Sequence, residues 1–126
     1  MTNLDLDCAV AAGKFIAEVR PRPSRQDMEK LLTETSAVLA ANGPYAMFLH
    51  LAPRGRKIPL AERLGAELYG RLRETRALEA VAGSSEVVLS RVAEMSKDFH
   101  KLLLARRVLQ QTLAYLRQHA KTLERA

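Results

Sequence analysis

Residues 99–123 read FHKLLLARRVLQQTLAYLRQHAKTL, a run without glycine, proline or carboxylate. Most of its large apolar side chains fall in one arc of a helical wheel drawn at about 100° per residue. This arc holds Leu104, Val108, Leu109, Leu113, Tyr115, Leu116 and Leu123. Basic side chains gather on the other side, between about 180° and 280°: Arg106, Arg107, Arg117, Lys121 and Arg125. The stretch therefore predicts a long C-terminal helix with a buried side and a cationic side.

The composition of the whole chain favours helices as well. Among its 126 residues are 20 Leu and 19 Ala, but only 8 Val and 2 Ile. Leu and Ala lose little freedom in a helix, whereas β-branched residues favour strands. A hydrophobic content of 48% with 27% charged residues excludes a disordered chain. We therefore predict one all-α domain over residues 1–126, a compact bundle of five or six helices that ends in the long C-terminal helix.

The first helix is expected from about residue 3 to residue 20. Thr2 and Asp5 have the spacing of a capping box, and the prolines at 21 and 23 end the helix. The predicted apolar face contains Leu6, Val10 and Ala17, joined by Ala9, Gly13 and Ile16.

A second helix begins after Ser24, whose hydroxyl suits an N-cap. Its buried stripe is predicted to be Met28, Leu31, Leu32, Thr35, Val38 and Leu39. Asn42-Gly43 allows positive φ at the helix end, and Pro44 suits the first turn of the next element. The apolar segment 45–51 is a buried helix or a buried strand, which periodicity does not distinguish.

A basic loop is expected between Pro53 and Pro59, and Pro59 then starts a helix with a four-residue leucine repeat. The repeat consists of Leu60, Leu64, Leu68 and Leu72. Arg63, Glu67 and Arg71 form an i, i+4 charge ladder, which we interpret as a solvated face.

The last third of the chain contains one or two more helices. Ser84 or Ser85 could cap a helix bearing Val88, Leu89 and Val92. Ser96 could cap the final helix towards Arg125, or a single helix could run from 85 to 125.

Basic residues outnumber acidic ones, 20 to 14, which gives a net charge of +6 and a pI near 9.9. A small domain with this charge commonly meets phosphates of nucleic acid or of a membrane surface. The acidic start does not resemble a signal peptide, and no apolar run approaches the ~18 residues of a membrane span. We therefore expect a cytoplasmic protein.

No known catalytic or metal-binding pattern occurs. The chain has no P-loop, no H-E-x-x-H and no Cys/His cluster with zinc spacing. His50, His100 and His119 lie far apart and have no carboxylate or second His at i+4, and Cys8 is predicted to be a core residue. These observations predict a protein that is not an enzyme, with no cofactor and no metal.

The cationic side of the C-terminal helix is the strongest functional signal. No acidic residue of the same stretch neutralises it, which is the arrangement that binding to a nucleic-acid backbone requires. The candidate RNA contacts are Arg106, Arg107, Arg117 and Lys121, followed by Arg54, Arg56 and Lys57 of the basic loop. A helical adaptor whose basic face meets an acidic protein partner, without RNA, is the alternative. A helical DNA-binding regulator is a third interpretation, although no helix-turn-helix pattern stands out.

The order of these features resembles a known family. A helix with Leu4 and Ala9, the Asn42-Gly43 break, the apolar segment 45–51 and the leucine-repeat helix precede a C-terminal signature. That signature is Phe99, Leu103, Leu113, Tyr115, Leu116, Arg117, His119 and Ala120. The sequence is similar to the small all-helical subunit of the type III-B CRISPR–Cas effector, the Cmr complex.

The resemblance implies a non-catalytic structural subunit of an RNA-guided antiviral complex. Its copies would stack along the groove that holds guide RNA and target RNA, and its partners would be the other subunits and both RNAs. Base pairing between guide and target would supply sequence discrimination. Tyr115 and Leu116 correspond to packing positions of the family signature, and Arg117 corresponds to its basic position.

Overall fold

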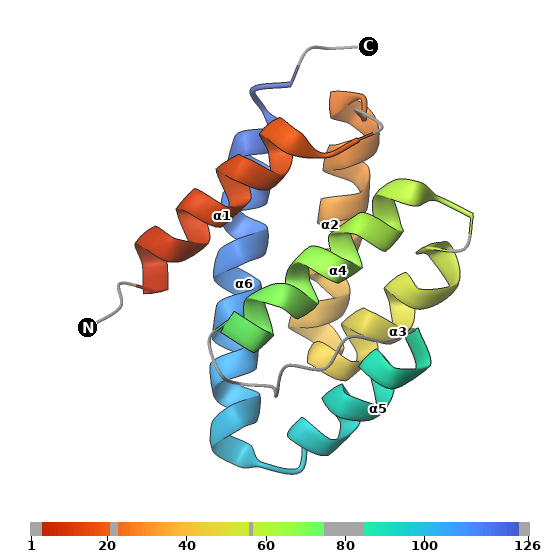
Figure 1. The fold of residues 1–126 in the computed structure, drawn as a ribbon, viewed down its shortest axis with the longest axis vertical. Helices are drawn as coiled ribbons and strands as arrows, with labels where there is room; N and C mark the ends of the chain where they lie inside the picture. The colour runs from red at the N-terminus through yellow and green to blue at the C-terminus, as the bar shows by residue number, and fades with distance from the viewer. Residues whose placement is uncertain (1–3, 21–22, 56, 75–84, 124–126) are drawn as a thin grey trace.

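The computed structural model describes residues 4–20, 23–55, 57–74 and 85–123, and these ranges contain six α-helices and no strand (Figure 1). The helices are α1 (Leu4–Glu18), α2 (Arg25–Asn42), α3 (Pro44–Gly55), α4 (Pro59–Glu74), α5 (Ser85–Met95) and α6 (Phe99–Ala120). The all-α prediction is confirmed, and α6 is the longest helix. It is also the central one, because α1, α2, α3 and α4 all pack against it, while α5 packs on α3.

The start of α2 and the boundary between α2 and α3 are explained by the residues at those positions. Ser24 is the N-cap of α2, where its hydroxyl accepts a hydrogen bond from the Asp27 amide at 3.1 Å. Gly43 ends α2 at a φ of 92°, which a residue with a side chain adopts at a cost. Pro44 then begins α3, so the apolar segment 45–51 is a helix and not a strand; Met47, Phe48 and Leu51 are buried, but Tyr45 and Leu49 are exposed.

Two helices, not one, span residues 85–120. The cap of α6 is Asp98, whose carboxylate accepts hydrogen bonds from the amides of His100 and Lys101. The prediction that Ser96 caps this helix is wrong: its hydroxyl donates to the Val92 carbonyl and closes the end of α5. A carboxylate is a strong acceptor for first-turn amides, so the break falls between residues 95 and 99. The last helix ends at Ala120, short of the predicted Arg125, which lies outside the described residues.

The predicted core stripes on α2, α4 and α6 are largely confirmed. Leu64, Leu68 and Leu72 of α4 are fully buried, as are Val108, Leu109, Leu113 and Leu116 of α6. Leu60, Val88, Leu89 and Tyr115 are partly buried and pack against this core, and Val38 is half-buried. Leu104 is the exception on α6, because it lies at the edge of the stripe and is 36% exposed.

The apolar face predicted for α1 is right for Ile16 but wrong for Leu6, Val10 and Ala17, which are exposed. Leu6 and Val10 are 57% and 62% exposed, while Cys8, Ala12, Ile16 and Val19 form the buried face. α1 and α6 come close to each other at Gly13. A Cβ on Gly13 would lie only 3.1 Å from Cε1 of His119 on α6. Gly13 thus lies where the two helices come closest, and the buried face combines the small Cys8 and Ala12 with Ile16 and Val19.

Candidate nucleic-acid interface

Of the predicted RNA contacts, Arg107, Arg117 and Lys121 lie together on the outer face of α6 or directly after its end. All three side chains are exposed. None of them forms a hydrogen bond or ion pair with another residue that the structure describes. The ion pairs found in the described ranges lie elsewhere, within α2, within α4 and in the turn after α5. At 1.5 Å rise per residue, the three cations extend over about 21 Å of helix. We name them the α6 cationic face.

Arg106 has a different role from its neighbour Arg107. It is half-buried, and its Nη2 donates a hydrogen bond of 2.8 Å to the carbonyl oxygen of Ala40 near the end of α2. In a continuing helix this carbonyl would accept from the amide of residue 44, but Pro44 has no N–H. The guanidinium of Arg106 replaces the missing donor. Arg106 therefore joins α6 to α2, and we leave it out of the α6 cationic face.

The basic loop predicted between Pro53 and Pro59 is helical in its first part, because α3 extends to Gly55. Arg54 belongs to the last turn of α3, where its guanidinium donates to the His50 carbonyl at 3.0 Å. Lys57 is exposed in the short turn that follows, and Arg56 lies outside the described residues. This turn lies on the opposite side of the bundle from α6 (Figure 1). The structure therefore does not bring Arg54 and Lys57 together with the α6 cationic face.

The histidines and the cysteine occupy ordinary structural positions. Burial lowers the pKa of His50, the nearby Arg54 lowers it further, and Glu34 partly opposes both. Cys8 is fully buried, and its sulfur accepts a hydrogen bond from the Thr112 hydroxyl at 3.4 Å, as expected of a core residue. Within the described ranges, no three His, Cys, Asp or Glu side chains gather where they could hold a metal ion. No helix in the same ranges is both long and apolar enough to cross a membrane.

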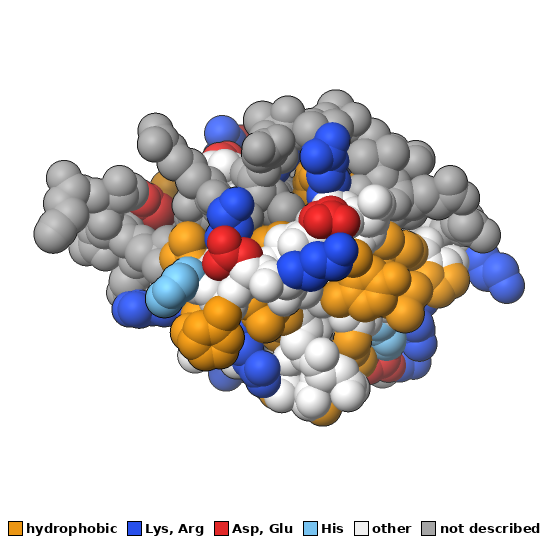
Figure 2. Space-filling model, turned by 90° about the horizontal axis from the view of Figure 1, so that it is seen from below, with side chains coloured by type: hydrophobic (Ala, Val, Ile, Leu, Met, Phe, Trp, Pro, Cys, Tyr) orange, Lys and Arg blue, Asp and Glu red, His pale blue; other side chains and the backbone are white. Residues whose placement is uncertain are grey.

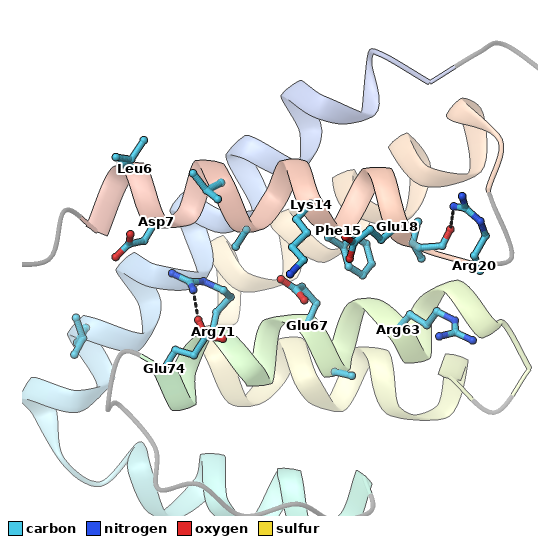
Figure 3. A pocket seen from close by; sticks show the side chains of 15 residues that line it. Leu6, Asp7, Lys14, Phe15, Glu18, Arg20, Arg63, Glu67, Arg71 and Glu74 are labelled. Atoms are coloured by element: carbon cyan, nitrogen blue, oxygen red, sulfur yellow. Dashed lines mark hydrogen bonds and ion pairs between the residues drawn. The ribbon is translucent and has the colours of Figure 1, made fainter.

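The partial burial of the charge ladder on α4 is the main feature that the sequence did not reveal. The ladder faces a groove between α1 and α4 (Figure 3) and is not simply solvated. Arg71 is only 6% exposed, and its guanidinium contacts the Glu74 carboxylate and the Cys8 sulfur of α1. On a helical wheel Arg71 falls between Leu60 and Leu64, inside the leucine arc. That position is the signal that could have indicated its burial.

Glu67 is the second member of the charge ladder whose environment the groove determines. It is half-buried, and Figure 3 shows it opposite Lys14 of α1. Burial raises the pKa of the Glu67 carboxyl above its ordinary value of 4.5. Arg71 and Lys14 lower this pKa, and Glu74 raises it, but burial is the largest cause. In the groove, Arg71 is paired with Glu74 and the Glu67 carboxyl is influenced by Arg71 and Lys14, whereas the α6 cationic face has no such opposite charge among the described residues.

Compared with known proteins, the chain matches no family model, no curated protein and no solved structure.

Proposed function

We propose that this protein binds the RNA backbone through Arg107, Arg117 and Lys121. The observation that carries the proposal is that these exposed cations have no hydrogen-bond or ion-pair partner among the described residues. Lys and Arg beside phosphates release condensed counterions, so a cationic helix face gives affinity without reading bases. The net charge of +6 adds long-range attraction for a polyanion.

The biological setting that we propose rests on the resemblance described above. The protein is a non-catalytic subunit of an RNA-guided CRISPR–Cas effector of type III-B, stacked beside other subunits along the guide-RNA and target-RNA groove. The all-helical fold is compatible with this role. In such an assembly the small subunit supplies backbone contacts, while base pairing supplies specificity.

The RNA proposal is tested with the double variant Arg107→Glu/Arg117→Glu. Binding of a labelled RNA is titrated at several salt concentrations. We expect weaker binding to all sequences. The plot of log affinity against log salt has a negative slope, which should become shallower by about 1.4, or 0.7 for each lost phosphate contact. Arg106 is kept intact in this design because it supports α2.

The matched control is Arg63→Glu/Arg91→Glu, which makes the same change in net charge at exposed sites on α4 and α5. We expect this control to weaken binding much less. An equal loss in both double variants would show general attraction to a basic protein and would contradict a site on α6. An unchanged salt slope in a folded Arg107→Glu/Arg117→Glu variant would also contradict the proposal.

The adaptor alternative is favoured by one observation, the exposed Leu6 and Val10 that line the groove between α1 and α4. Exposed aliphatic side chains at a groove are typical of protein contacts. Purification from the native cell distinguishes the two functions. An effector subunit is recovered with several proteins and a short RNA, whereas an adaptor is recovered with a protein partner and no RNA.

A further inference from the structure

The first turns of α6 expose apolar side chains on the same side as the α6 cationic face. Phe99 is 67% exposed and Leu103, one turn later, is 50% exposed. At about 100° per residue, Phe99 and Leu103 fall at the same angles around α6 as Arg117 and Lys121. Figure 2 views the end of the bundle where α5 ends and α6 begins, and hydrophobic side chains reach its surface beside Lys and Arg. The outer side of α6 is therefore apolar at its start and cationic further along.

Phe99 differs from the other aromatic residue of α6. Tyr115 is partly buried and packs against the core, whereas the Phe99 ring has little protein around it. The backbone that carries Phe99 is nevertheless fixed, because Asp98 caps the first turn. The His100 ring lies beside it, with ring centroids 6.1 Å apart and planes at 66°. Phe99 is thus an aromatic ring in a defined position with much of its surface open to solvent.

We propose that Phe99, supported by Leu103, stacks against an unpaired base of the RNA strand whose phosphates contact the α6 cationic face. The inference rests on the proposed function and defines its substrate class as single-stranded RNA. Proteins that bind single strands combine a cationic surface with aromatic side chains, since every base has a face that can stack. Phe99 lies about 12 Å from Arg107 along the helix axis, so one extended strand reaches both. In a duplex the faces of the bases are already stacked and do not reach Phe99.

The experiment compares three labelled ligands of equal length with the full chain: an adenosine oligonucleotide, an abasic oligomer with the same phosphates, and an RNA duplex. We expect the adenosine strand to bind more tightly than the abasic one. Phe99→Ala should weaken binding of the adenosine strand by roughly five- to a hundredfold. The same variant should leave binding of the abasic oligomer unchanged, and Phe99→Trp should restore or strengthen binding of the adenosine strand.

Tyr45→Ala is the matched control, because Tyr45 is an exposed aromatic residue on α3. Its removal should not change the affinity for any ligand. Equal binding of the adenosine and abasic strands, with no effect of Phe99→Ala, overturns the stacking site. If the Arg107→Glu/Arg117→Glu variant still loses affinity in that case, backbone binding stands and only the stacking site fails. If the wild-type chain binds none of the ligands, both proposals fail.

Discussion

In the groove between α1 and α4, Arg71 is 6% exposed and contacts Glu74 and Cys8, whereas on the outer face of α6 Arg107 and Arg117 are exposed. The side chains are chemically identical, but α4 contains three glutamates and α6 contains no carboxylate. The surroundings differ as well: the Cys8 sulfur of α1 contacts Arg71, but no described helix covers the outer face of α6. Whether an arginine is buried or open to a ligand therefore depends both on the carboxylates of its own helix and on the helix beside it.

The largest effect expected from this comparison is on folding. Arg71→Glu would place a carboxylate beside Glu67 and Glu74 in a buried position, and we expect a loss of about 3–5 kcal/mol of unfolding free energy. Arg107→Glu, at an exposed position, should change it by no more than about 0.5 kcal/mol. Urea denaturation of both variants measures the difference. Similar losses in the two variants would show that the two arginines do not occupy different environments.

A smaller effect is expected at the contact between α6 and α2. Arg106→Ala removes the donor to the Ala40 carbonyl, which has no alternative backbone partner because Pro44 lacks an N–H. The loss should be about 1 kcal/mol, since solvent reaches part of this site and replaces some of the hydrogen bond. Arg107→Ala is the matched control on the next residue and should leave unfolding unchanged. If both alanine variants unfold at the same urea concentration, Arg106 does not support the end of α2.

The local features of the fold could be predicted from the sequence because each depends on a few adjacent residues. Ser24, Gly43 and Pro44 define the boundaries of α2 and α3 wherever those helices lie. The leucine repeat likewise indicates the buried side of α4 without information about its neighbours. The cap of α6 was misassigned because Ser96 and Asp98 are both suitable N-cap residues, and only the path of the chain selects between them.

The candidate site was harder to predict because it depends on which helices become neighbours. The sequence placed Arg106 and Arg107 in one stripe, but α2 lies beside the first and not beside the second. In α1, Ile16 and Val19 face the core while Leu6 and Val10 face outward, so hydrophobic character alone does not identify the buried side. Periodicity describes one helix at a time and contains no information on how near the next helix comes.

The smallest effect concerns pH and the groove. The pKa of Glu67 is raised by burial, so the folded state binds its proton more tightly than the unfolded state does. As pH rises from 4.5 through the raised pKa, the native protein holds more protons than the unfolded chain, and the free energy of unfolding therefore falls. Glu67→Gln should remove this loss of unfolding free energy. The variant should therefore be more stable than wild type, by a larger margin at neutral pH than in acid. Thermal melts at several pH values measure this difference, and Glu62→Gln, at an exposed site on the same helix, is the control. If Glu67→Gln is less stable than wild type at neutral pH, attraction to Arg71 and Lys14 outweighs burial, and the groove stabilises this carboxylate.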